Sequence, residues 1–330
     1  MGIENFWKGR NVFVTGADGF ICSWVAKKLV DNGANVTIIV RDFKKNPGYK
    51  LAGLTEKEIN IVMGDIVNFD SVKRAINEYE TEFCFHLAAQ AIVQTANRSP
   101  LSTFESNIKG TWNILEACRT TETVKGIIVA SSDKAYGVQK KLPYTEDSPL
   151  QGLYPYDASK ACTDILTRSY FRSYGLPVAV TRNANIYGGG DTNWNRIIPD
   201  VMRCILKDQE LLIRSDGTPE RDYMYIKAAV NAYLTLAENI SKPEVKGEAF
   251  NFGTGKPVSV KDLVNKIIQV SGKSIQPKIL GQAKNEIDKQ YLDATKAKTI
   301  LGWKTKYSLE EGLMETFEWY KNHPSLLLSV

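Results

Sequence analysis

Short apolar runs alternate with helix-forming stretches from residue 11 to about residue 184, and this alternation constrains the fold more than any other feature of the chain. The runs are NVFVTG (11–16), NVTIIV (35–40), INIVMG (59–64), EFCFHLAA (82–89), KGIIVASS (125–132) and PVAVTR (177–182). They are apolar nearly throughout, as expected of strands that helices cover on both faces. The pattern predicts an α/β fold with a doubly wound parallel sheet.

The pattern becomes irregular after NIYGGG (185–190), and helical stretches such as VSVKDLVNKIIQV follow towards the C-terminus. We predict a smaller C-terminal α/β cap that packs over the sheet edge and leaves a ligand-binding cleft. The predicted sheet domain is 1–184 with a return near 222–253, and the predicted cap is 185–221 and 254–330.

Composition excludes several classes of function. The 42 basic and 37 acidic residues give a net charge of +5, without a basic run dense enough for nucleic acid. No stretch approaches the roughly 18 apolar residues of a membrane span. Five cysteines without a C-x-x-C pair predict free thiols in a reducing cytoplasm. Only two histidines are available, so no metal site is expected.

A glycine turn, TGADGFIC, follows the first strand and opens a helix. Gly16 and Gly19 permit a tight turn and let the backbone approach a pyrophosphate that sits on the helix N-terminus. The third glycine position holds Cys22, a small thiol that either fits there or sets helix and strand slightly farther apart. The turn predicts a dinucleotide site, and a glycine-rich turn without a ligand is the alternative.

The second strand ends in Arg41 and Asp42. A carboxylate there favours the ribose 2′-hydroxyl of NAD, whereas an arginine favours the 2′-phosphate of NADP. Asp42 favours NAD as the cofactor, with NADP as the second choice. An ordinary solvated strand end is the alternative for both residues.

Tyr156 and Lys160, in YPYDASK, stand four residues apart and share one helix face. An ammonium group beside a phenol stabilises the phenolate, so Lys160 is expected to lower the pKa of Tyr156 and make it a usable base. Ser131 and Ser132 end the preceding strand and offer a hydroxyl to the same substrate oxygen. Tyr156, Lys160 and Ser132 are therefore the predicted catalytic groups for hydride chemistry.

Several motifs occur together in this order over essentially the whole chain: TGADGFI, GDI, HLAAQ, NIKGTWNILEACR, SSDKAYG, YDASK, TRNANIYGGGD, PERDYMYI and DATKAKTILGWKTKYSLEEGL. With them the chain resembles the extended short-chain dehydrogenase/reductase family, and within it the nucleotide-sugar epimerases and 4,6-dehydratases. The resemblance implies a Rossmann domain, a nicotinamide dinucleotide and a nucleotide-diphosphate sugar as substrate.

The family motifs also imply binding residues. The implied cofactor positions are Gly16, Gly19, Phe20, Ile21, Arg41, Asp42, Asp65, Ile66, Leu87, Ala88, Ala89, Tyr156 and Lys160. The implied substrate positions are Gln90, Asn107, Asn185, Arg196 and Arg221. Arginine suits the diphosphate because it binds phosphate through two hydrogen bonds, whereas Arg182 is expected to be structural.

The triplet Ser132, Asp133 and Lys134 resembles CDP-glucose 4,6-dehydratases. Epimerases of this family usually carry small groups after the serine, whereas dehydratases carry acid/base groups. By analogy Asp133 is the acid that helps the C6 oxygen leave and Lys134 is the base that takes the C5 proton, although the roles can be shared or exchanged. A surface ion pair between Asp133 and Lys134 is the structural alternative.

Two other functions stay open at this point. One is a nucleotide-sugar 4-epimerase of the same fold, and the other is a dinucleotide-binding protein without catalysis. The stretch from 215 to 227 follows the general dehydratase and epimerase pattern, so the nucleotide base and the sugar also stay open.

The helix through FESNIKGTWNILEACR carries Phe104, Ile108, Trp112 and Leu115 on one side. Family members often pair such helices in a dimer interface, so a homodimer is expected. Ordinary core packing is the alternative.

Overall fold

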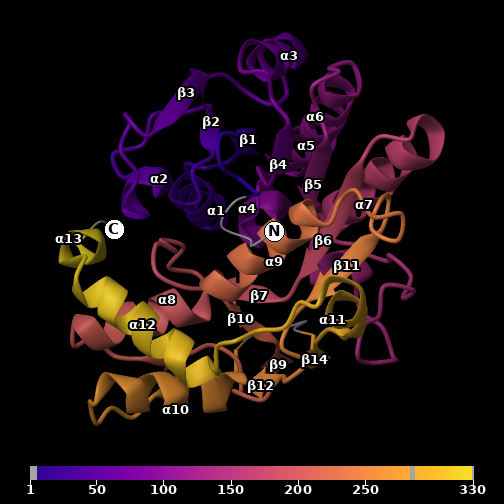
Figure 1. Ribbon diagram of the computed structural model, residues 1–330. Helices are drawn as coiled ribbons and strands as arrows, with labels where there is room; N and C mark the ends of the chain where they lie inside the picture. Colours follow the sequence, from indigo (N-terminus) through magenta and orange to yellow (C-terminus); the bar gives the residue numbers. More distant parts are fainter. Residues whose placement is uncertain (1–5, 283–286, 329–330) are drawn as a thin grey trace.

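A seven-stranded parallel sheet forms the centre of the molecule, as Figure 1 shows for the computed structural model, which describes residues 6–282 and 287–328. The strand order is β3-β2-β1-β4-β5-β6-β11. The strands are β1 (Asn11–Thr15), β2 (Asn35–Val40), β3 (Ile59–Met63), β4 (Phe83–His86), β5 (Gly126–Ala130), β6 (Val178–Asn183) and β11 (Ala249–Phe252). The predicted doubly wound sheet is confirmed, and β11 adds a strand beyond the six predicted runs.

Helices cover both faces of this sheet. One face carries α1 (Phe20–Asp31) and α9 (Ile226–Glu238), and the other carries α3 (Phe69–Glu78), α6 (Gly110–Arg119) and α7 (Pro155–Tyr174). Side chains alternate along β1, so Val12 and Val14 pack into the core on the α1 and α9 face. Phe13 packs into the core on the α3 and α6 face. Each such fully buried side chain stabilises the fold by roughly 1.5–3 kcal/mol.

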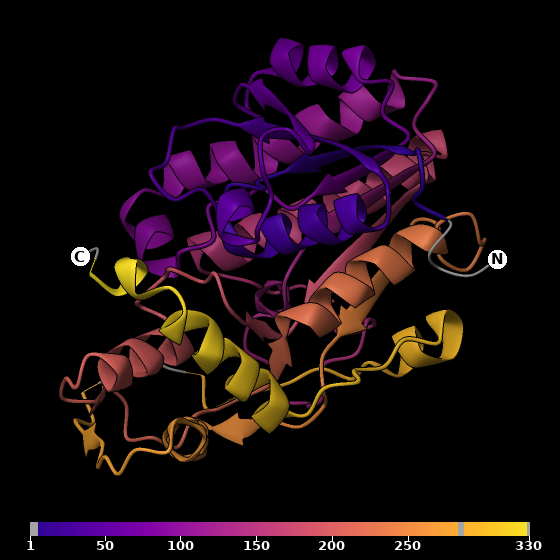
Figure 2. The same cartoon turned by 60° about the vertical axis from the view of Figure 1, so that its left-hand side comes forward.

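The remaining elements come mostly from the segments predicted as the cap, and Figures 1 and 2 show them gathered below the sheet. The helices are α8 (Ile197–Leu206), α10 (Val260–Ser271), α11 (Thr295–Leu301), α12 (Leu309–Lys321) and α13 (Pro324–Leu327). The short strands are β7 (Asn185–Tyr187), β8 (Leu212–Ile213), β9 (Glu220–Arg221), β10 (Tyr223–Tyr225), β12 (Val258–Ser259), β13 (Lys278–Ile279) and β14 (Lys289–Gln290). The division into two domains stays a prediction.

Short helical pieces complete the loops around the sheet. They are α2 (Gly48–Leu51), α4 (Val93–Arg98), α5 (Pro100–Phe104), the π-helical segment η2 (Glu105–Lys109) and the 3-10 segment η3 (Asp133–Tyr136). Within the described ranges, the helices are all too short or too polar to cross a lipid bilayer.

Candidate active site

The carboxyl ends of β1, β4 and β5 meet at one edge of the sheet, where doubly wound folds bind their ligands. Thr15 ties two of these strand ends together, because its Oγ1 accepts hydrogen bonds from the amides of Leu87 at 3.1 Å and Ala88 at 3.0 Å. Ser132 follows β5 at the same edge. The predicted glycine turn, the HLAAQ segment and the SDK triplet are thus brought together.

The glycine turn has the geometry that a pyrophosphate requires. Gly16 has φ +79°, and a Cβ atom on it would lie 2.9 Å from the Cα of Ala88 and 3.1 Å from the Sγ of Cys22. Gly19 is the N-cap residue of α1, and no described side chain caps that helix, so its first N–H groups can meet an anion. The turn therefore fits a dinucleotide pyrophosphate.

Cys22 is buried at the third glycine position. Burial raises the pKa of its thiol to about 12, and the charge of Asp18 adds to the shift. The group is therefore a neutral thiol that helix α1 accommodates directly against the turn.

Arg41 and Asp42 form an exposed ion pair at the end of β2, with 2.7 Å between Nε and Oδ2 and side chains 59% and 60% exposed. The hydrogen bond to Asp42 raises the pKa of Arg41. Asp65 accepts a hydrogen bond from the amide of Val67, and Ile66 is buried beneath Gly110. Because Arg41 and Asp42 pair with each other, the prediction that Asp42 selects NAD over NADP stays a prediction.

Tyr156 lies in the first turn of α7, and its pKa is raised, not lowered. Burial raises it to about 12, while the charge of Arg196 and a hydrogen bond with Ser132 act in the opposite direction. Lys160 donates from Nζ to the main-chain oxygen of Ala130 at 2.8 Å, and burial lowers its own pKa to about 8. The expected lowering of the Tyr156 pKa is wrong for this structure, because burial outweighs the charge of Arg196.

The SDK triplet begins η3. Ser132 donates from Oγ to Oδ1 of Asp133 at 3.0 Å, and Asp133 is only 3% exposed. Lys134 donates from Nζ to Oε1 of Gln290, whose Nε2 in turn donates to the main-chain oxygen of Asp133 at 3.1 Å. The surface ion pair considered for Asp133 and Lys134 is therefore wrong: Asp133 is buried, and Lys134 is held by an amide from the C-terminal segment.

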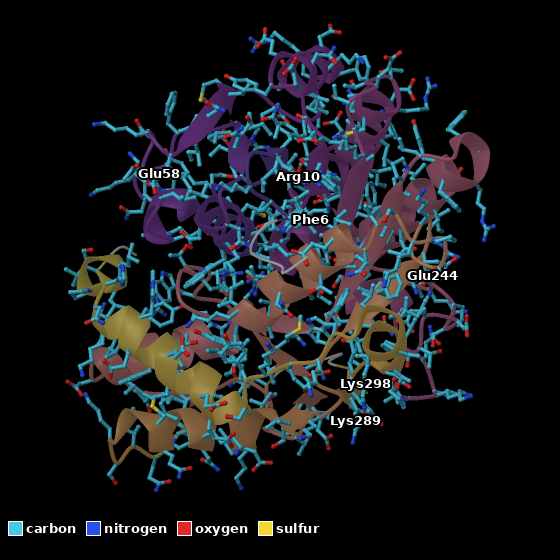
Figure 3. All side chains as sticks on the ribbon, in the orientation of Figure 1. Phe6, Arg10, Glu58, Glu244, Lys289 and Lys298 are labelled. Atoms are coloured by element: carbon cyan, nitrogen blue, oxygen red, sulfur yellow. The ribbon has the colours of Figure 1, made fainter. Side chains whose placement is uncertain are left out.

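Gln290 was not predicted from the sequence. It occupies β14, where strand alternation directs it inward while Lys289 lies at the lower surface in Figure 3 and pairs with Glu220 at 2.7 Å. A single glutamine in a two-residue strand carries no recognisable sequence signal. Only the return of the chain to η3 shows its place in the site.

Asp157 was also missed, although it stands inside YDASK. Burial raises its pKa to about 6, and the nearby charges of Lys134 and Asp133 lower and raise it respectively. A perturbed carboxyl beside a proposed acid/base pair is typical of a functional site.

The predicted substrate residues approach the site from the C-terminal segments. Arg196, just before α8, pairs with Asp191 at 2.9 Å and lowers the pKa of Tyr156. Arg221 is the Cα partner of Gln290 across the β9–β14 pair, and its guanidinium donates to the main-chain oxygen of Glu220 at 2.9 Å. Asn185 donates to the main-chain oxygen of Asp222 at 3.3 Å. Arg196 and Arg221 thus supply positive charge near the Tyr156 and Gln290 side of the site.

Asn107 is held by hydrogen bonds within the protein. Asn107 lies in the π-helical turn η2, and its side-chain amide contacts the main chain of Gln90. Its Oδ1 accepts from the Gln90 N–H at 2.7 Å, and its Nδ2 donates to the Gln90 main-chain oxygen at 3.2 Å. It also donates to Oγ of Ser159 at 2.8 Å, so both amide donors and the oxygen are engaged. Asn107 therefore positions the Gln90 main chain, and its contact with a substrate stays a prediction.

Fold and site together define the extended short-chain dehydrogenase/reductase class. A family model described as GDP-mannose 4,6 dehydratase matches residues 13–316, and the chain belongs to this family of nucleotide-sugar dehydratases and epimerases. A CDP-glucose 4,6-dehydratase from Salmonella typhimurium is 30% identical over 96% of this chain and 92% of its own length.

Solved structures agree on the fold. A UDP-glucose 4-epimerase from Thermotoga maritima, solved with UDP-glucose, is 32% identical over 95% of this chain and 99% of that one, with a TM-score of 0.87. A UDP-glucuronic acid 4-epimerase from Bacillus cereus, solved with UDP-glucuronic acid and NAD, is 26% identical, with the same coverage and a TM-score of 0.84. The relatives therefore include both dehydratases and epimerases.

Proposed function

We propose that the protein is a nucleotide-sugar 4,6-dehydratase that converts a CDP-glucose-like substrate to a 4-keto-6-deoxy sugar and water. The observation that carries this proposal is the placement of Asp133 and Lys134 beside Ser132 and Tyr156. A 4-epimerase needs a base at O4, whereas a dehydratase also needs proton transfers at C5 and C6. Asp133 and Lys134 are groups of the type that those two extra steps require.

The cofactor that suits the site is NAD. The cramped Gly16, the uncapped start of α1 and the edge formed by Leu87, Ala88 and Ala89 fit a dinucleotide. When bound, NAD supplies the acceptor for the hydride of sugar C4 and later the donor of a hydride to C6. The NAD that accompanies the Bacillus cereus structure supports the same choice.

The chain's own residues then move the protons. Tyr156 takes the O4 proton, assisted by the charge of Arg196. The resulting carbonyl acidifies C5. Lys134 has further N–H donors besides the one on Gln290, which suits donation to the departing C6 oxygen. The Asp133 carboxylate suits acceptance of the C5 proton and its return to C5 when C6 receives the hydride. The contacts thus favour the exchanged assignment of the two roles.

Incubation with CDP-glucose and a panel of other nucleotide sugars, followed by mass spectrometry, tests the function. Dehydration removes one water from the sugar. Tyr156→Phe should lower kcat by roughly 10²–10⁴-fold because the base at O4 is lost. A variant as active as the wild type would contradict the mechanism.

A 4-epimerase is the second candidate, favoured by the 32% identity to the Thermotoga maritima enzyme. It predicts a product of unchanged mass and altered stereochemistry at C4. A protein that binds the dinucleotide without catalysis would change none of the sugars in the panel.

We also propose a homodimer, a cytoplasmic location and the division into a cofactor domain and a cap. The apolar side chains of Leu101, Trp112 and Ile165 are exposed on α5, α6 and α7, which supports pairing of these helices. Leu115, predicted on the same stripe, is instead buried in the core. Light scattering of the purified chain tests the dimer.

A further inference from the structure

The loop of residues 41–47, which joins β2 to α2, closes against the glycine turn, and α2 lies beside α1 (Figure 1). Gly48, the first residue of α2, donates from its main-chain N–H to the main-chain oxygen of Asp18 at 2.9 Å. A Cβ atom on Gly48 would lie 2.3 Å from the main-chain oxygen of Gly19, so the two backbones are in direct contact. The loop therefore borders the turn at one end and the ribose position predicted for Asp42 at the other.

An ion pair fastens this loop to the turn. The Nζ of Lys44 lies 2.6 Å from Oδ2 of Asp18 and 3.5 Å from the main-chain oxygen of the same residue. Among residues 6–282 and 287–328, Lys44 is the only group that pairs with the Asp18 carboxylate, and that carboxylate does not cap α1. The two side chains are 49% and 20% exposed, and a pair this exposed adds little to stability. Its position in the turn therefore calls for a reason other than stability.

The Asp18 carboxylate is an unfavourable neighbour for the cofactor. Asp18 directly precedes Gly19 at the start of α1, where the first N–H groups are open to the pyrophosphate of NAD. A carboxylate and a pyrophosphate carry charges of the same sign, so each disfavours the other at this place. Lys44 cancels the carboxylate charge, and the same contact holds the loop against the turn.

The neighbouring cations of the loop are engaged differently. Arg41 pairs with Asp42, with 2.7 Å between Nε and Oδ2. Lys45 is exposed and makes no ion pair or hydrogen bond within the part of the chain that the structure describes. Lys45 carries the same charge as Lys44 one residue further along the loop, so it provides a matched control.

We propose that Lys44 is a positioning residue for NAD that acts through Asp18: its ammonium group cancels the carboxylate charge beside the pyrophosphate and keeps the loop closed on the turn. Its importance in turnover rests on the proposed dehydratase function. In that reaction the hydride taken from C4 returns to C6 of the same sugar, so early loss of the reduced cofactor would leave an oxidised sugar without the returned hydride.

Calorimetric titration of the purified, cofactor-free protein with NAD tests the inference without any sugar. Lys44→Met should raise the Kd of NAD about tenfold, because it exposes the pyrophosphate to the uncompensated Asp18 charge. Lys44→Arg should restore the Kd to within about threefold of the wild type, since the charge returns. Lys45→Met should change the Kd less than about twofold. Equal values for Lys44→Met and Lys45→Met overturn the inference.

A double-mutant cycle shows whether Lys44 acts through Asp18. In an Asp18→Asn background the repulsive charge is absent, so adding Lys44→Met should change the Kd of NAD less than about twofold. A tenfold loss that persists in this background overturns the inference, because Lys44 would then act on the cofactor directly. A wild type that dehydrates none of the nucleotide sugars overturns the proposed function instead, whereas the two titrations still decide the role of Lys44.

Discussion

Helix α7 carries two buried acidic residues in opposite circumstances. Asp164 forms two hydrogen bonds with Arg182, at 2.7 Å from Nε and 3.0 Å from Nη2, and Arg182 also donates to Tyr136 and to the main-chain oxygen of Glu146. Asp157, two turns earlier, has charged neighbours but receives no hydrogen bond within the described chain. Asp164 and Arg182 thus form a saturated pair, in which both carboxylate oxygens accept a hydrogen bond, whereas the Asp157 carboxylate is unsaturated.

The difference follows from where each turn of α7 lies. Asp164 packs behind β6 in the interior, where an unpaired charge would be intolerable. Asp157 lies beside η3 at the carboxyl edge of the sheet, the edge where doubly wound folds bind their ligands. The paired Asp164 stabilises the fold, whereas the unpaired Asp157 carboxylate can still bind a further group.

The largest expected effect comes from breaking the saturated cluster. Asp164→Asn leaves the Arg182 charge buried without a counter-charge and should lower the free energy of unfolding by about 3–5 kcal/mol. Urea-induced unfolding measures it. Asp31→Asn, which breaks the exposed pair with Lys27, is the control and should cost less than about 1 kcal/mol. Equal losses in the two variants would contradict the comparison.

Neutralising the unsaturated carboxylate, Asp157, should raise the free energy of unfolding, the opposite of the effect at Asp164. Burial raises the pKa of Asp157 from 3.8 to about 6, so the folded state binds this proton more tightly than the unfolded state. The contribution to stability is complete below the unfolded pKa and is lost as pH rises through the folded one, about 1–3 kcal/mol in all because solvent screens the charge. Asp157→Asn should therefore stabilise the protein by up to about 3 kcal/mol at pH 8 and little at pH 4. Unfolding curves that show the same effect at both pH values would refute this assignment.

A smaller effect should follow from loosening Lys134. Gln290→Leu removes the acceptor for Lys134 and the donor to Asp133, and should lower kcat about tenfold, which corresponds to about 1.4 kcal/mol. Lys289→Ala is the neighbouring control, because Lys289 lies at the surface (Figure 3). Initial rates with the converted nucleotide sugar measure both. Equal losses would mean that β14 as a whole matters, not the inward amide.

The sequence predicted those parts of the candidate site whose residues lie close together in the chain. The turn at Gly16, the SDK triplet and the spacing of Tyr156 and Lys160 each lie within a few residues of one another, so strand ends and helix period suffice to place them. Gln290 reaches η3 from more than 150 positions away, which no local pattern contains. Asn107 was assigned to the substrate from the family motifs, and its hydrogen bonds with Gln90 depend on a π-helical turn that no local pattern predicts.

By itself, the sequence determined the parallel sheet and the glycine turn and indicated the candidate catalytic groups, because apolar periodicity and helix spacing are properties of neighbouring residues. Only the tertiary structure decided how those groups ionise. Burial raises the pKa values of Tyr156 and Asp157 and lowers that of Lys160, reversing the simple expectation from Lys160 alone. Desolvation depends on what the rest of the chain packs around a side chain, and that is decided when the sheet, α7 and the C-terminal segments come together.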